Sequence, residues 1–393
     1  MKHDGGKKSL AASSAFRFVL ILGIANLFAD LNYEGARSST GQFLGTLGAS
    51  AAVVGFTAGF GELLGYALRS VSGIISDKTG KYWVVTVVGY VVNMLAVPAL
   101  ALAGNWPIAA GLIIAERTGR AIRKPATEAM LSFAGKQIGH GWVFGLNEAL
   151  DQTGATIGPL VLAFVLFRHG SYQNGFALLL IPALLAIAIV LIARYFFPDP
   201  QHLEVTESIA PGKFPLAFWL YMAANACIGA GFADFALIAF HFQKTAAVAT
   251  NLIPIYYAVA MAMGALGALI FGKLFDKIGL TVVLVVFFLS AFFAPLVFLG
   301  SGWIALLGMA LWGIGMSAQG SLLSALIAGV IHSNKRSTAF GVFDTGFGVA
   351  WFLGSWLMGV LYQRSISAVI IFSVVIQLLA LPIFLFAKRS ERQ

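Results

Sequence analysis

Long runs of apolar residues, separated by short polar segments, make up most of the chain. The run LLLIPALLAIAIVLIA at 178–193 is continuously apolar and lacks the alternation of apolar and polar residues that marks a membrane β-strand. A spanning helix needs about 20 mostly apolar residues. The pattern therefore predicts an all-α integral membrane protein with twelve spans, at 16–36, 50–75, 82–103, 106–122, 141–167, 172–197, 214–242, 250–272, 280–299, 302–329, 338–362 and 366–387.

Composition supports this interpretation. Hydrophobic residues make up 59% of the 393 residues and charged residues only 10%, whereas soluble domains carry roughly 25% charged residues. The first apolar run has no short hydrophobic core with an A-x-A exit, so we expect a retained span rather than a cleaved signal.

The net charge of +9 is distributed as a topology signal. Most basic residues fall in every second predicted loop, which the positive-inside rule places in the cytoplasm, together with both termini of a protein of the inner membrane. We therefore expect no nucleic-acid partner. The residues assigned to these loops are Lys2, Lys7, Lys8, Arg17, Lys78, Lys81, Arg120, Arg123, Lys124, Lys136, Arg194, Lys213, Lys273, Lys277, Lys335, Arg336, Lys388, Arg389 and Arg392.

Three segments of the first half recur, in the same order, in the second half. GIISDKTG at 73–80 matches GKLFDKIG at 272–279, FADL at 28–31 matches FADF at 232–235, and FGLNEALDQTGATIG at 144–158 matches FGVFDTGFGVAWFLG at 340–354. The duplication predicts two six-helix bundles, 1–196 and 214–393, joined by a polar cytoplasmic linker at 197–213.

Three motifs carry a resemblance to a known family. GIISDKTGK resembles the loop signature G-x-x-x-D-x-x-G-R/K of the major facilitator superfamily, and its second copy strengthens the match. ERTGRAIRKPA resembles the superfamily's pattern around a membrane-embedded arginine, here Arg117, although Ala121 stands where many members have Gly. GATIGP resembles an element of proton-driven exporters and assigns helix packing to Gly154, Gly158 and Pro159. The chain is identified as a member of this superfamily, with no subfamily assigned.

The resemblance implies a secondary transporter in which two bundles alternate around a central site. It also implies a conformational gate at the two repeated loops, in which Asp77 can cap a helix N-terminus and pair with a basic residue when the halves close on the cytoplasmic side; an ordinary turn or cap residue is the alternative. The gate residues are Gly73, Asp77, Gly80, Lys81, Gly272, Asp276 and Gly279.

Ionisable residues inside the predicted spans are the candidates for substrate binding or proton coupling. Such residues cost about 2.5–3.5 kcal/mol each at the centre of a helix and usually face a partner or a wet cavity. Depth along the spans places Glu62, Glu116 and Asp151 near the middle of the bilayer. The full set is Asp30, Glu34, Glu62, Glu116, Arg117, Glu148, Asp151, Asp234 and Asp344.

The repeats rank these candidates. Asp30 is matched by Asp234, which favours a functional role, whereas Asp151 has no duplicate and is our first candidate for the proton carrier. Glu148 is matched by Asp344 and reads as part of a shared scaffold or inner gate. For Glu34, a local ion pair with Arg37 is an equal alternative, and we expect Arg69 to extend to the cytoplasmic surface.

Carboxylates outnumber cations in the predicted cavity, and burial favours the protonated form of a carboxylic acid. We therefore expect a proton-coupled antiporter that exports a small cationic or zwitterionic organic compound. Import of a metabolite or metal chelate such as a siderophore, with Arg117 or Arg69 meeting an anionic group, is the alternative, and a transporter-like membrane sensor is a further one.

Known enzyme motifs and a nucleotide-binding loop are not found in the sequence, so we do not expect an enzyme. We also expect no cofactor and no resident metal. The expected partners are the substrate, protons and the lipid bilayer, with the chain functional as a monomer.

Overall fold

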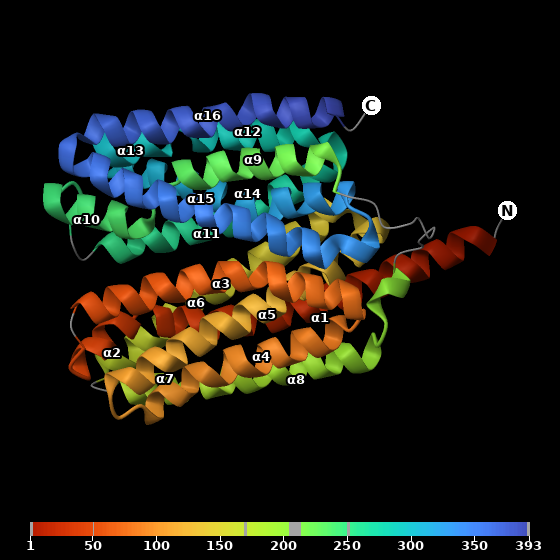
Figure 1. The fold of residues 1–393 in the computed structure, drawn as a ribbon, viewed down its shortest axis with the longest axis horizontal. Helices are drawn as coiled ribbons and strands as arrows, with labels where there is room; N and C mark the ends of the chain where they lie inside the picture. The colour runs from red at the N-terminus through yellow and green to blue at the C-terminus, as the bar shows by residue number, and fades with distance from the viewer. Residues whose placement is uncertain (1–2, 50, 169–170, 204–213, 250–251, 391–393) are drawn as a thin grey trace. The chain divides into compact units, whose positions relative to one another are not determined.

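A computed structural model describes residues 3–49, 51–168, 171–203, 214–249 and 252–390 (Figure 1). These residues form helices and short connections, with no strand among them. Most of the predicted linker, 204–213, lies outside the described residues, so the division of the chain at 197–213 stays a prediction.

The α-helices are α1 (His3–Arg37), α2 (Thr40–Thr46), α3 (Ala51–Thr79), α4 (Tyr82–Ala99), α5 (Trp106–Ile138), α6 (His140–Phe167), α7 (Tyr172–Leu178), α8 (Leu180–Phe196), α9 (Leu216–Gly231), α10 (Phe235–Thr245), α11 (Ile253–Ile278), α12 (Leu280–Ser290), α13 (Phe293–Leu299), α14 (Trp303–Val330), α15 (Arg336–Arg364) and α16 (Ile366–Ser390). Short 3-10 turns lie at Leu100–Leu102, Pro200–Leu203 and Ser333–Lys335.

Helices occupy all twelve predicted spans. In the described part of the chain, nine stretches are long and apolar enough to cross a membrane by themselves. Of the other three spans, α3 is a single helix of 29 residues, α5 has charged residues along its length, and the seventh span is divided into α9 and α10. The twelve-span prediction fits this arrangement.

The largest difference from prediction is the length of α5. The apolar pattern ended this span at 122 and assigned Arg120, Arg123 and Lys124 to a loop, but the helix continues to Ile138. Asn105 begins the helix by accepting a hydrogen bond from the Ile108 amide at 3.1 Å. The three basic residues therefore lie within a helix, and the loop assignment was wrong.

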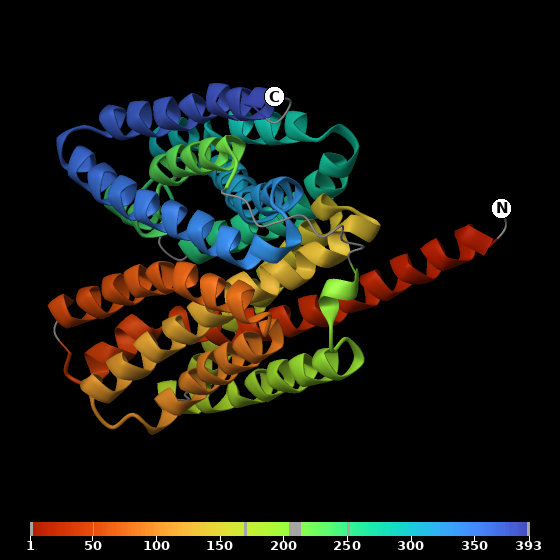
Figure 2. The same cartoon turned by 45° about the vertical axis from the view of Figure 1, so that its right-hand side comes forward.

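Contacts group the chain into two compact units. Unit 1 comprises residues 1–139, 150–209 and 332–345, and unit 2 comprises 140–149, 210–331 and 346–393. In unit 1, α4 packs against α5 and α8, and α3 packs against α5; in unit 2, α9 packs against α16 and α11 against α14 (Figure 1 and Figure 2). The first turns of α6 are thus counted with unit 2, and those of α15 with unit 1.

An apolar core in unit 1 fixes the end of α1 next to α5. Phe43 and Phe176 meet edge to face with their ring centroids 4.9 Å apart, and Tyr33, Val97 and Leu100 belong to the same buried cluster. Aromatic pairs of this kind contribute about 0.5–1.5 kcal/mol beyond their buried area. The core therefore holds the ring of Tyr33 in a defined place.

Candidate functional site

Charged side chains gather on α5 in the middle of unit 1. Glu116, Arg120 and Arg123 follow one another at intervals of four and three residues, which places them on one face of the helix. Glu116, Arg117 and Arg123 are buried, and Arg123 is only 5% exposed. Charged groups this deeply buried need partners, because an isolated buried ion is strongly disfavoured.

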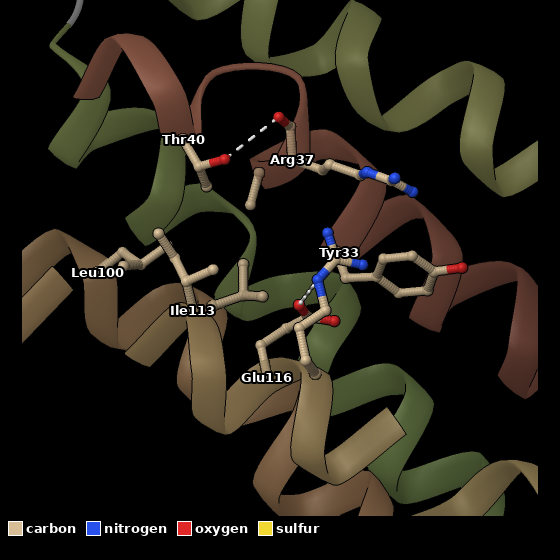
Figure 3. Close-up of a pocket in the computed structure, with 9 residues that line it drawn as sticks. Tyr33, Arg37, Thr40, Leu100, Ile113 and Glu116 are labelled. Atoms are coloured by element: carbon tan, nitrogen blue, oxygen red, sulfur yellow. Dashed lines mark hydrogen bonds and ion pairs between the residues drawn. The ribbon is translucent and has the colours of Figure 1, made fainter. Parts of the chain in front are cut away.

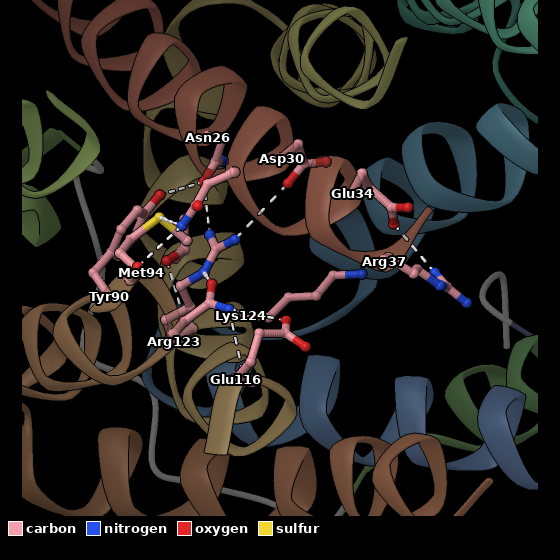
Figure 4. Close-up of polar contacts among 12 residues, drawn as sticks. Asn26, Asp30, Glu34, Arg37, Tyr90, Met94, Glu116, Arg123 and Lys124 are labelled. Carbon is pink, nitrogen blue, oxygen red and sulfur yellow. Dashed lines mark hydrogen bonds and ion pairs between the residues drawn. The ribbon is translucent and has the colours of Figure 1, made fainter. Parts of the chain in front are cut away.

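Arg123 has the most complete set of partners. Its Nε donates a hydrogen bond to Asn93 Oδ1 at 3.1 Å and its Nη1 to Asn26 Oδ1 at 2.9 Å. The guanidinium carbon lies 4.4 Å from the centroid of the Tyr90 ring, and the Tyr90 hydroxyl also donates to Asn26. The Asp30 carboxylate, 8% exposed, is 3.9 Å from Nη2 (Figure 4). Two amides and a ring thus hold Arg123, with Asp30 beside it.

A second chain of ion pairs runs from α1 to α5. Glu62 Oε1 is 3.0 Å from Arg37 Nη2 and 3.2 Å from Arg117 Nη1. Arg117 Nε is 3.3 Å from Glu116 Oε2, and Glu116 also accepts a hydrogen bond from Asn93 at 3.0 Å. The local pair of Glu34 with Arg37, expected as one alternative, is present at 3.1 Å (Figure 4).

A small pocket opens between this chain of ion pairs and the apolar core (Figure 3). Its polar lining includes Arg37, Thr40 and Glu116, and its apolar lining includes Leu100 and Ile113. The ring of Tyr33 also lines it.

A third group joins α3, α5 and the beginning of α15. Arg69 Nη1 donates to Asp344 Oδ2 at 2.9 Å, and Lys124 Nζ lies 3.7 Å from the same oxygen and 3.7 Å from Glu128. Arg69 is only 6% exposed. The expectation that Arg69 extends to the surface was therefore wrong, because a carboxylate far away in the sequence partners it inside the protein.

Asp77, in the first repeated motif and within the last turn of α3, binds the beginning of α15. Its carboxylate accepts hydrogen bonds from the backbone amides of Ser337 at 3.2 Å and Thr338 at 2.6 Å, and from the Tyr82 hydroxyl at 2.7 Å. Burial raises the pKa of the Asp77 carboxyl above its ordinary value. Asp77 thus caps the start of α15, where the backbone amides are otherwise unsatisfied, and the expected pairing with a basic residue stays a prediction.

Asp276, in the second copy, does the same at the beginning of α6. It accepts hydrogen bonds from the backbone amides of Gly141 at 2.8 Å and Trp142 at 2.7 Å. Gly80 and Gly279 follow α3 and α11 with φ of 65° and 59°, a conformation that favours glycine at a helix end. The two loops are therefore built alike within their respective units.

The remaining loop residues have simpler surroundings. A Cβ on Gly73 would clash with the carbonyl of Ser337, and one on Gly272 with the carbonyl of Gly141, so these glycines permit close helix contact. Lys81 is exposed at the beginning of α4.

The other predicted residues lie on α6 or in the seventh span. Asp151 is close enough to Tyr90 to interact with it electrostatically, so it belongs to the surroundings of Arg123. The Glu148 carboxylate lies against Gly320 of α14, within unit 2. Asp234 lies between α9 and α10, where its backbone carbonyl accepts from Leu237 at 3.0 Å. Asp30 is instead inside a continuous helix, so the two matched aspartates have different local structures.

The G-x-x-x-G-P element of α6 faces α1. A Cβ on Gly154 would clash with the carbonyl of Leu27, and one on Gly158 with the carbonyl of Leu31. The two helices therefore approach to backbone contact, with Pro159 inside α6.

A family model described as Major Facilitator Superfamily matches residues 14–354. The chain belongs to the major facilitator superfamily. Membership establishes a multi-pass membrane protein that performs secondary transport, and it groups the chain with transporters rather than enzymes.

Similar proteins match this chain over nearly its whole length. An uncharacterized protein of Mycobacterium tuberculosis is 37% identical over 389 residues, which span 97% of this chain and 95% of that protein. A bacterial homologue of the iron transporter ferroportin, solved in an outward-facing state, has a TM-score of 0.76 at 13% identity and covers 95% of this chain and 99% of its own. The Escherichia coli fucose:proton symporter has a TM-score of 0.70 at 15% identity, with 96% and 99% covered. The two structures show a shared fold.

Part of the polar cluster of this superfamily member was not predicted from the sequence. Asn26, Tyr90 and Asn93 are uncharged residues within predicted spans, and Arg120 and Arg123 were assigned to a loop. The spacing of Glu116, Arg120 and Arg123 was the available signal, because it repeats at helical intervals beyond the assigned end of the span. Among the described residues, no group of three His, Cys, Asp or Glu side chains could hold a metal ion.

Proposed function

We propose that this superfamily member is a proton-coupled transporter in which Asp30 is the proton-binding group. The observation that carries the proposal is the geometry around Arg123, which is hydrogen-bonded by Asn26 and Asn93 while Asp30 remains 3.9 Å away. If Asp30 gains a proton, the guanidinium keeps its two hydrogen bonds and its contact with Tyr90. Three contacts of Arg123 therefore do not depend on the charge of Asp30.

Other carboxylates in the set are bound more tightly to cations. Asp344 accepts a 2.9 Å hydrogen bond from Arg69, and Glu62 lies between Arg37 and Arg117 at 3.0 and 3.2 Å. Neutralising Asp344 would remove the hydrogen-bonded counter-charge of the buried Arg69, and neutralising Glu62 would remove a direct contact of two arginines. Asp151, our first candidate from the sequence, lies near the same Tyr90 and is the second candidate for the proton.

The charges around Asp30 narrow the expected charge class of the substrate. Glu34, Glu62, Glu116 and Asp344 each have an ion pair with Arg or Lys, so the excess of carboxylates inferred from the sequence is not found among these residues. This removes the argument for a purely cationic compound and leaves a zwitterionic one. Its cationic group and a proton would compete for Asp30, which gives export by proton antiport.

The two repeated loops fit the conformational part of this cycle. Asp77 and Asp276 each bind a helix start through backbone amides. We assign them as contacts that form and break as the transporter alternates. We place the protein in the cytoplasmic membrane with both termini in the cytoplasm. The working unit is the monomer.

Proteoliposomes loaded with the pH-sensitive dye pyranine test the coupling. A small-molecule extract of the host cells is added outside, proton movement is read from the dye, and the compounds that enter are identified by mass spectrometry. We expect proton movement in the opposite direction to one or more compounds with the wild-type protein. Asp30→Asn should transport without moving protons, while Asp199→Asn, the same change at an exposed turn, should behave as wild type.

Two outcomes would contradict the proposal. Compounds that move together with protons would establish the symport alternative, and unchanged coupling in both Asp30→Asn and Asp151→Asn would remove these residues from the proton pathway.

A further inference from the structure

Arg120 differs from the other arginines of α5 in its contacts. Its guanidinium carbon lies 4.2 Å from the centroid of the Tyr33 ring, a cation–π distance. Among the described residues, the guanidinium of Arg120 forms no hydrogen bond and no ion pair. Arg117 and Arg123, one turn away on either side, each contact a carboxylate. Arg120 is thus a positioned cation whose donors are not used by the protein.

The carboxylates around Arg120 are already engaged elsewhere. Asp30, Glu34 and Glu116 all interact with it electrostatically. Each of them, however, makes its direct contact with another arginine: Asp30 with Arg123, Glu34 with Arg37, and Glu116 with Arg117. The surroundings therefore stabilise the charge of Arg120 without occupying its N–H groups.

Stacking on Tyr33 also sets the direction in which Arg120 can bind. A guanidinium with one face on an aromatic ring presents its N–H groups at the edge, where a planar pair of oxygens accepts two parallel hydrogen bonds. Tyr33 is buried and belongs to the apolar core of unit 1, so the stack is held from behind. A guanidinium prepared in this way loses little conformational entropy when it binds an acid group.

We propose that Arg120 is the binding residue for an acid group of the transported compound, a carboxylate or another organic oxyanion. The inference rests on the proposed function, because it assigns the acid end of the zwitterion whose cationic end would contact Asp30. The substrate class becomes a small organic acid that also carries a positive charge. Lys at position 120 would supply the charge without the two parallel donors.

The test compares full-length variants in cells and in proteoliposomes. Untargeted mass spectrometry of cells overproducing wild type, Arg120→Lys, Arg120→Gln and the exposed control Arg194→Gln identifies compounds whose level depends on the protein. We expect these compounds to contain an acid group. Their transport should fall at least tenfold in Arg120→Gln, less in Arg120→Lys and not at all in Arg194→Gln. The methyl ester of the same compound should not be transported by the wild type.

The outcomes separate this inference from the proton coupling. A compound without an acid group, full transport by Arg120→Gln, or no protein-dependent compound at all would overturn the role of Arg120. An esterifiable acid that is lost in Arg120→Gln, but whose transport ignores an imposed pH difference, would support Arg120 and contradict only the proton-coupled mechanism.

Discussion

The tenth span, α14, occupies in unit 2 the place that the fourth span, α5, occupies in unit 1. Gly119 of α5 packs against the backbone of Asn93 in α4, and Gly315 of α14 packs against the side chains of Phe232 and of Ser290 in α12. With these glycines aligned, five charged residues of α5 have uncharged counterparts in α14. Glu116, Arg117, Arg120, Arg123 and Lys124 correspond to Trp312, Gly313, Met316, Gln319 and Gly320.

The difference shows that the repeat preserves helix contacts but not chemistry. Where α5 has Arg117 facing α3, α14 has Gly313, at which a Cβ would clash with the carbonyl of Ala260 in α11. Trp312 instead joins an aromatic group in which the centroids of Tyr257 and Phe235 are 4.4 Å apart. The charged side chains of the α5 cluster therefore belong to unit 1, while the corresponding part of unit 2 contains aromatic rings and closely packed backbone.

The largest difference in stability loss is expected between Arg123 and its counterpart Gln319. Arg123→Met leaves Asp30 and two amides without their buried partner, and removing one side of a buried pair costs about 3–5 kcal/mol. Gln319→Met should change stability by less than about 0.5 kcal/mol, because Gln319 makes no hydrogen bond among the described residues. Melting temperatures of the purified proteins in detergent measure both.

A second variant checks the cause of this loss. Adding Asp30→Asn to Arg123→Met should recover part of the lost stability, because the remaining buried charge is removed. Equal losses for Arg123→Met and Gln319→Met would contradict the assignment of the charged cluster to unit 1.

A smaller effect is expected at Gly313, the counterpart of Arg117. Gly313→Ala introduces a Cβ at the α11 contact, and overpacking of this kind costs about 1–3 kcal/mol. Gly359→Ala is the matched control, since its Cβ would meet no atom within 4 Å. Thermal unfolding of the two variants should separate them, and identical melting temperatures would show that the close approach of α11 and α14 is relieved by a small shift.

The smallest difference concerns the repeated aspartates, where we expect the units to behave alike. Asp77→Asn and Asp276→Asn keep an oxygen acceptor but lose the charge at a helix start, which costs about 0.5–2 kcal/mol. The two variants should lower the melting temperature by similar amounts, relative to Asp199→Asn. A loss confined to one of them would mean that the two loops do not serve the same purpose.

Most of the fold could be predicted because continuous apolarity reports spans directly. The α7–α8 span was found in this way, whereas the motifs with Asp77 and Asp276 were found from the internal repeats. The predicted end of α5 was wrong because charged residues were taken to mark a loop. That rule fails where charged side chains inside a helix are paired with side chains of other helices. Arg123 is a case in point, since Asn26, Asn93 and Asp30 come from helices distant in the sequence.

Partners also explain what the sequence could not reveal about the site. Arg69 and Asp344 are on different helices near opposite ends of the chain, and nothing local to either residue points to the other. Arg120 differs from the other arginines of α5 because it has no such partner among the described residues. Recognising this difference requires the contacts of all its neighbours, which the sequence does not give.

The backbone contacts of Asp77 and Asp276 have a consequence for how the duplicated sequence diverged. Each aspartate is satisfied by main-chain N–H groups, which every residue except proline provides. The donating positions can therefore carry different side chains: they are Ser337 and Thr338 on one side, and Gly141 and Trp142 on the other. The two aspartates keep the same kind of contact after duplication, although the residues that donate to them differ.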